Sequence, residues 1–118
     1  MNVRNALAGV AVRSRKDAQV WYERLLGRPA DSVPMDEVAE WEFPDGGCLQ
    51  VFADPDRAGS SSVTFSVRSL DEQIGYLESN DIAVGRRTDS KIVRTALVQD
   101  PDGNQIVFAE PLTDAIAQ

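Results

Sequence analysis

Two stretches of the sequence match each other closely: PDGGCLQVFADP at residues 44–55 and PDGNQIVFAEP at residues 101–111. Each opens with a Pro-Asp-Gly turn and continues into an apolar run that ends at an acid and a proline. The tripeptide VRS at residues 12–14 recurs earlier in the same order, at residues 67–69. These matches keep an offset of 55 to 57 residues. Collinear matches at a near-constant offset indicate two copies of one supersecondary unit.

Each copy predicts the element order strand, helix, strand, strand, strand. The strand at 62–68 alternates apolar and polar residues, which is the period of a half-buried strand. Ser14 in the first copy and Ser69 in the second are followed three residues later by an acid, a signature of a helix start. The predicted strands are 7–13, 32–35, 38–43 and 48–53 in the first copy, and 62–68, 82–84, 92–99 and 105–110 in the second.

The length of the chain fits one domain, residues 1–118, because 118 residues are too few for two ordinary domains. The first module is expected over about 5–55, a polar linker over 56–61 and the second module over about 62–111. We expect an α+β fold in which two βαβββ modules form a curved mixed sheet around a concave ligand groove. The helices are expected to cover the other face, and a small molecule would occupy the groove.

The charge of the chain disfavours two classes of partner. Nineteen acids against twelve bases give a net charge of −7, which repels phosphate backbones and anionic lipids. No run of residues is long and apolar enough for a membrane span, and the N-terminal stretch lacks a secretory pattern. We therefore expect a small-molecule partner, neutral or cationic, and neither nucleic acid nor membrane.

Two residue types that carry much of enzyme chemistry are scarce. The chain has no histidine, the commonest general base and a frequent transition-metal ligand. Its one cysteine, Cys48, allows no intrachain disulfide and no cysteine-rich zinc site. Since the chain forms no intrachain disulfide and lacks a secretory pattern, we expect a reducing, cytoplasmic location. Without a histidine partner, Cys48 is interpreted as a small strand residue and not as a nucleophile.

Two motifs carry a resemblance to a known family. Trp21-Tyr22 precedes Leu25-Leu26-Gly27, and the turn at 100–104 precedes Ile106-Val107-Phe108. With the internal repeat, these motifs resemble the vicinal oxygen chelate superfamily, which holds glyoxalase I, extradiol dioxygenases, fosfomycin-resistance enzymes and bleomycin-resistance proteins. The resemblance covers about residues 7–111. It implies the fold described above, whereas the superfamily hosts many activities.

The resemblance also implies where a metal would be held. In metal-using members, the ligands fall at the positions that Leu7, Val51, Ser62 and Val107 occupy here. Three of these are aliphatic, and a serine alone is a poor ligand for a divalent ion. Glu110 lies three residues beyond Val107, an odd offset that places it on the opposite face of a strand. The sequence therefore predicts no metal and no cofactor.

The missing ligands make the chain resemble the bleomycin-resistance branch most closely. Members of that branch lack the metal and bind a drug in a groove formed by two chains. The resemblance implies a homodimer, and the polar linker at 56–61 permits both an exchanged and an unexchanged arrangement of its modules. An acidic chain suits a cationic drug. One departure is Ile92, which stands where that branch has a large aromatic residue, and Trp41 or Phe43 is the expected substitute.

Strand alternation and the resemblance together predict the ligand-binding residues. If Leu7 faces the cavity, Gly9 and Ala11 do so as well. Ser62 and Thr64 would line the other side with hydroxyl groups, or else form a water-facing surface. The predicted ligand-binding residues are Leu7, Trp41, Phe43, Val51, Ser62, Thr64, Ile92, Arg94 and Val107, with no catalytic and no metal-binding residue.

Two of these residues are predicted from their charge surroundings. Trp41 stands between Glu40 and Glu42, so indole and carboxylates together are a candidate cation seat, with core packing of the indole as the alternative. Arg94 is a basic residue within a strand expected to border the groove. It would bind a ligand carboxylate or pair with Glu40 or Glu42.

The function that follows is a metal-free protein that sequesters a small molecule, with an antibiotic or a cationic metabolite as the candidate ligands. The alternative is a metal-independent lyase or isomerase on the same scaffold, with Glu40, Glu42 or Asp36 as the base. A third hypothesis is a module that binds another protein through an exposed apolar groove.

Overall fold

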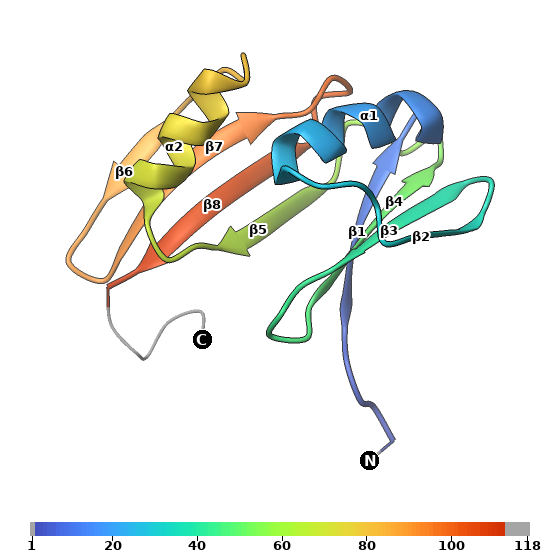
Figure 1. Cartoon of the computed structure of the whole chain (residues 1–118), viewed down its shortest axis with the longest axis horizontal. Coiled ribbons are helices and arrows are strands. Elements are labelled where there is room, and N and C mark those ends of the chain that lie inside the picture. The colour runs from blue at the N-terminus through green and yellow to red at the C-terminus, as the bar shows by residue number, and fades with distance from the viewer. Residues whose placement is uncertain (1, 113–118) are drawn as a thin grey trace. The chain divides into compact units, whose positions relative to one another are not determined.

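The computed structural model describes residues 2–112 (Figure 1), and the chain divides into two units. Within the described residues, the first unit holds 2–61 together with the turn 101–104, and the second holds 62–100 and 105–112. None of the helices in residues 2–112 combines the length and apolar character needed to cross a membrane.

Each unit contains one four-stranded mixed sheet and one helix. The first has the strands β1 (Leu7–Val12), β2 (Ser32–Met35), β3 (Val38–Glu42) and β4 (Cys48–Ala53), with helix α1 (Arg15–Leu26). The second has β5 (Ser62–Ser66), β6 (Arg87–Asp89), β7 (Val93–Gln99) and β8 (Gln105–Pro111), with helix α2 (Leu70–Ser79). The predicted α+β fold of two βαβββ copies is confirmed.

The two sheets have the same topology. Their strand orders are β1-β4-β3-β2 and β5-β8-β7-β6, so each first strand lies at an edge next to the last strand of its unit. That pair is parallel, and the remaining neighbours are antiparallel. The helix supplies the crossover that a parallel pair requires. The duplication seen in the sequence is therefore a duplication of strand order and direction.

One predicted strand is misplaced. Residues 82–84 are a loop, and the short strand β6 lies five residues later. Ile82 is buried, and its amide donates to the carbonyl oxygen of Leu77 at 2.9 Å, directly after α2. Its apolar side chain was therefore a packing signal at the end of a helix and not the start of a strand.

Local signals define the ends of both helices. The hydroxyl of Ser14 accepts from the amide of Asp17 at 3.3 Å, and that of Ser69 accepts from the amide of Glu72 at 3.2 Å. Helix α1 ends at Gly27, whose φ of 74° is in the left-handed region and whose amide bonds to the carbonyl oxygen of Glu23 at 2.9 Å. The serine-based prediction of both helix starts is confirmed.

Strand register separates each sheet into a face packed against its helix and a face turned away from it, which we call the distal face. The first helix-packed face holds the buried residues Val10, Val12, Ala39, Trp41, Leu49 and Val51. The second holds Val63, Ala96, Val98, Ile106 and Phe108. Helices α1 and α2 add Ala18, Tyr22, Leu25, Leu70, Ile74 and Leu77 to these two cores.

Candidate ligand-binding faces

The distal face of the first sheet combines apolar side chains with two carboxylates. By register it holds Leu7, Gly9, Ala11, Val38, Glu40, Glu42, Cys48, Gln50 and Phe52. The Glu40 carboxylate accepts hydrogen bonds from the side-chain amide of Gln50 and, at 3.4 Å, from the hydroxyl of Ser32. Leu7 is about half exposed, at 51%. The face can therefore offer negative charge next to apolar contact.

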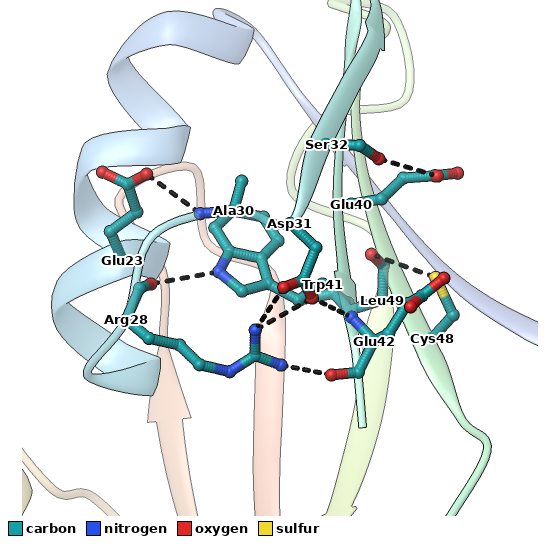
Figure 2. A network of polar contacts seen from close by, with 10 residues as sticks. All are labelled: Glu23, Arg28, Ala30, Asp31, Ser32, Glu40, Trp41, Glu42, Cys48 and Leu49. Carbon is teal, nitrogen blue, oxygen red and sulfur yellow. Dashed lines mark hydrogen bonds and ion pairs between the residues drawn. The ribbon is translucent and has the colours of Figure 1, made fainter. Parts of the chain in front are cut away.

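Cys48 lies on this acidic face and is a poor nucleophile. Partial burial raises the pKa of its thiol, and the neighbouring carboxylates of Glu40, Glu42 and Asp31 raise it further. The sulfur lies 3.8 Å from the carbonyl oxygen of Leu49 (Figure 2). A raised pKa leaves less of the thiolate, which is the nucleophilic form of a cysteine. This geometry agrees with the structural interpretation of Cys48.

The only aromatic residue at a paired position of this distal face is Phe52, which is absent from the set predicted by the sequence. It pairs with Ala11 of β1 and Val38 of β3. Gly9 leaves room for the ring, because a Cβ atom there would lie 3.1 Å from Cε1 of Phe52. The guanidinium carbon of Arg57 lies over the ring, 5.6 Å from its centroid. Strand period could have identified Phe52, since it lies an even number of residues from Cys48 and Gln50.

Trp41 and Val51 lie on the other face, against α1. The Trp41 side chain is fully buried, its indole N–H donates to the carbonyl oxygen of Arg28 at 3.2 Å, and its ring centroid lies 6.2 Å from that of Tyr22. Figure 2 shows the indole toward the helix and Glu40 on the opposite side of β3. The expected cation seat therefore does not form, because alternation separates Trp41 from its acidic neighbours.

The same alternation separates Val51 from Leu7. In the register, Leu7 pairs with Cys48, whereas Val51 pairs with Val10 and is fully buried. The residues of β4 that share a face with Leu7 are Cys48, Gln50 and Phe52. Direct ligand contact by Val51 and Trp41 is therefore not part of the site we propose.

A polar network fixes the segment between α1 and β3 (Figure 2). Nη1 of Arg28 donates to both carboxylate oxygens of Asp31, at 2.8 and 2.9 Å, and Asp31 accepts from the amide of Glu42 at 2.6 Å. The hydrogen bond from Arg28 and then that from the Glu42 amide lower the pKa of Asp31. The Arg28 guanidinium carbon also lies 5.9 Å from the ring centroid of Phe43. Phe43 thus has an intramolecular cation beside it.

The distal face of the second sheet carries no ionisable side chain at its paired positions. By register it holds Ser62, Thr64, Ser66, Thr88, Val93, Thr95, Leu97, Gln99, Gln105, Val107 and Ala109. The hydroxyls of Thr88 and Thr95 are hydrogen-bonded to each other. The structure thus places Ser62, Thr64 and Val107 of the predicted site on one face, where hydroxyls and aliphatic groups alternate.

Arg94 lies on the helix-packed face of the second sheet and is surrounded by acids. Its guanidinium nitrogens lie 3.0 Å from Asp71, 3.9 Å from Asp89 and 3.8 Å from Glu110. The hydrogen bond to Asp71 is the main reason that the pKa of Arg94 is raised. Glu110 also accepts from the amide of Leu70, at 2.8 Å, at the start of α2.

The ion pairs of Arg94 correct the expected pairing with Glu40 or Glu42, and the register of β8 confirms the expected face of Glu110. The acids that pair with Arg94 belong to its own unit and are not Glu40 or Glu42. Glu110 lies on the face opposite Val107, as the odd offset predicted. Ile92, at 50% exposed, precedes β7, and its carbonyl oxygen accepts from the amide of Leu112 at 2.8 Å.

Comparison with known proteins places the chain in a family. No protein-family model matches the sequence, and no curated protein matches it. Among solved structures, a glyoxalase/bleomycin resistance protein from Catenulispora acidiphila is 30% identical, with a TM-score of 0.83 over 92% of this chain and 98% of that chain. The chain belongs to the glyoxalase/bleomycin resistance family. The resemblance to the vicinal oxygen chelate superfamily is thereby confirmed.

Other solved structures share this fold and are described with different activities. An antibiotic-binding protein from a Streptomyces species is 20% identical, with a TM-score of 0.77 over 94% of this chain and 98% of that chain. A glyoxalase/dioxygenase from Nostoc punctiforme is also 20% identical, with a TM-score of 0.69 over the same shares of the two chains. At 20% identity, the similarity to these two proteins shows a shared fold and not a shared activity.

The side chains of this protein do not suit the metal ion that the metal-using members of the family bind. Of the four positions matched to metal ligands by the resemblance, Leu7 and Val107 have aliphatic side chains, and Val51 is aliphatic and lies on the helix-packed face, away from Leu7. Across residues 2–112, no three side chains of His, Cys, Asp or Glu are grouped so as to hold an ion. The strong donors that a divalent cation requires are not brought together in this part of the chain.

Proposed function

We propose that this glyoxalase/bleomycin resistance family member binds a small organic molecule on the distal face of either sheet, without a metal and without converting it. The observation that carries the proposal is the chemistry of those faces. They offer carboxylates, hydroxyls, amides and aliphatic groups, all of which bind and orient a ligand. They offer no imidazole, and burial and neighbouring carboxylates raise the pKa of their thiol, Cys48.

An antibiotic or a cationic metabolite is the proposed ligand class. Glu40 and Glu42 project from the first distal face, and the whole chain carries a net charge of −7. Such a charge raises the local concentration of cations. The hydroxyls of Ser62 and Thr64 on the second distal face would orient neutral polar groups. The Streptomyces structure, described as an antibiotic-binding protein, supports this choice by analogy of fold.

A thermal-shift screen of cationic antibiotics and metabolites, run with and without EDTA, tests this function. A ligand present at about 100 times its Kd stabilises a folded protein by roughly 2.7 kcal/mol. We expect equal shifts with and without the chelator, and mass spectrometry should recover the ligand unchanged after prolonged incubation. Loss of binding in EDTA contradicts a metal-free site. Steady formation of product supports the alternative, a metal-independent enzyme with Glu40, Glu42 or Asp36 as the base.

The proposed setting is the cytoplasm. A chain with one cysteine forms no intrachain disulfide and gains nothing from an oxidising compartment. Fractionation of the native host, with the protein detected by antibody, tests this location directly.

A further inference from the structure

The starting observation is that an aromatic ring on the acidic distal face already carries a cation from its own chain. Phe52 lies on the same face as Glu40 and Gln50, and the guanidinium of Arg57 lies over its ring, 5.6 Å from the centroid. A cation within about 6 Å of an aromatic face is attracted by the ring quadrupole. The chain itself therefore shows which kind of group this ring attracts.

The Arg57 side chain is held weakly. It is 69% exposed, and its ion pair with Asp54 has a nitrogen–oxygen distance of 3.7 Å. Exposed ion pairs of this kind contribute little stability, because water and salt screen them. The guanidinium can therefore leave the ring without disturbing the sheet beneath it.

The ring is held more firmly than the cation. Phe52 is half-buried within β4, between neighbours on β1 and β3, and Gly9 leaves the space that its edge occupies. Glu40 of β3 projects from the same face and pairs with Gln50, two residues from Phe52, whereas Glu42 lies farther along β3 and pairs with Cys48. A fixed ring beside negative charge is the arrangement used to bind organic cations.

We propose that the Phe52 ring is the seat for an organic cation, of the guanidinium or quaternary ammonium type, and that Arg57 is a built-in competitor occupying that seat. The proposal rests on the proposed function, because it names the ligand group that the first distal face takes. Ligand and guanidinium require the same ring face, and their like charges repel. Binding of the ligand therefore displaces Arg57 toward Asp54 and solvent.

The experiment titrates the protein with phenyltrimethylammonium at low salt and follows the backbone amides of Phe52 and its neighbours by NMR. Benzyl alcohol serves as the neutral probe. The variant Arg57→Gln removes the competitor, and we expect it to bind phenyltrimethylammonium roughly two- to fivefold more tightly, as loss of an exposed cation–π contact implies. The affinity of this variant for benzyl alcohol, which carries no charge, should not show this roughly two- to fivefold increase.

Two further variants provide the controls. Arg86→Gln makes the same change of net charge at an exposed residue of the other unit, and its affinity should equal that of the wild type. Phe52→Leu keeps an apolar side chain and removes the ring, so it should bind the cation several-fold more weakly both alone and combined with Arg57→Gln. Thermal unfolding of each variant checks that the fold is kept.

Several outcomes overturn the seat. The proposal is wrong if Arg57→Gln binds no more tightly than Arg86→Gln, if it binds more weakly, or if neither the wild type nor Arg57→Gln binds the cation. It is also wrong if Phe52→Leu binds as the wild type does. Should a compound from the antibiotic screen still bind the protein in these cases, only the seat is wrong and the proposed function stands. A screen that yields no ligand overturns the function itself.

Discussion

At the scale of single residues, Asn104 is a side chain that satisfies several backbone groups at once. It is fully buried, its amide nitrogen donates to the carbonyl oxygen of Ala11 at 2.8 Å, and its oxygen accepts from the amides of Gly59 at 3.0 Å and Ser61 at 2.8 Å. The hydroxyl of Ser61 in turn accepts from the amide of Ala11 at 3.0 Å. The Asn104 side chain thus satisfies the hydrogen bonding of three buried or half-buried backbone groups, one in the edge strand β1 and two in the segment before β5.

Replacing Asn104 by alanine should be strongly destabilising. The variant leaves those three backbone groups without their partner, and we expect the free energy of unfolding to fall by about 3 kcal/mol. Urea denaturation followed by circular dichroism measures the change. Asn5→Ala is the matched control, because the exposed Asn5 amide donates a hydrogen bond to the carbonyl oxygen of Gly46 at 2.6 Å. If both variants lose equally little stability, the Asn104 side chain does not hold these backbone groups together.

The sequence predicted the alternation of the strands but did not assign the residues of the first sheet correctly to its two faces. Glu40, Trp41 and Glu42 were expected to act together, yet a strand places the indole on one face and the acids on the other. The face of Trp41 was decided by packing against Tyr22 of α1, a contact that propensity does not report. Phe52 was missed because the family resemblance pointed to Val51, one residue away.

At the scale of elements, two glycines should respond in opposite ways to alanine. Gly27 ends α1 with φ of 74°, which strains any residue with a Cβ, so Gly27→Ala should destabilise by about 1 kcal/mol. Gly75 lies inside α2 with nothing within 4 Å of an added Cβ, so Gly75→Ala should stabilise by about 0.5–1 kcal/mol. Thermal unfolding of both variants measures whether the melting temperature falls for Gly27→Ala and rises for Gly75→Ala. A lower melting temperature for Gly75→Ala as well would contradict the expected gain in helix propensity in α2.

Element order was predictable because the serine caps of both helices, Gly27 at the end of α1 and the turn before each last strand are local signals. Strand β6 was not, because it is held by pairing with β7 and not by its own sequence. Its residues are all exposed, and Thr88 bonds to Thr95 through their hydroxyls. A three-residue strand with no apolar side chain gives no periodicity to detect.

At the scale of the whole molecule, we expect the protein to be a homodimer. Each unit has one helix for one sheet, and several large apolar side chains remain exposed in the single chain: Leu7, Val33, Met35, Ile92 and Leu112. A second copy would cover part of this surface. Light scattering after gel filtration should give twice the chain mass of 12.9 kDa. A mass of one chain, measured at a high protein concentration, would contradict the dimer. Exchange of modules between the two chains of the dimer is a separate proposal, which this measurement does not address.

The contact made by Asn104 also makes the two copies of the repeat unequal. Gly47 stands at the equivalent place in the first half, and a glycine cannot offer an amide side chain to another strand. A gene that encoded the first half twice would therefore leave the carbonyl oxygen of Ala11 without its partner. The two halves are not interchangeable, and a chimaera of two first halves would lack this hydrogen bond.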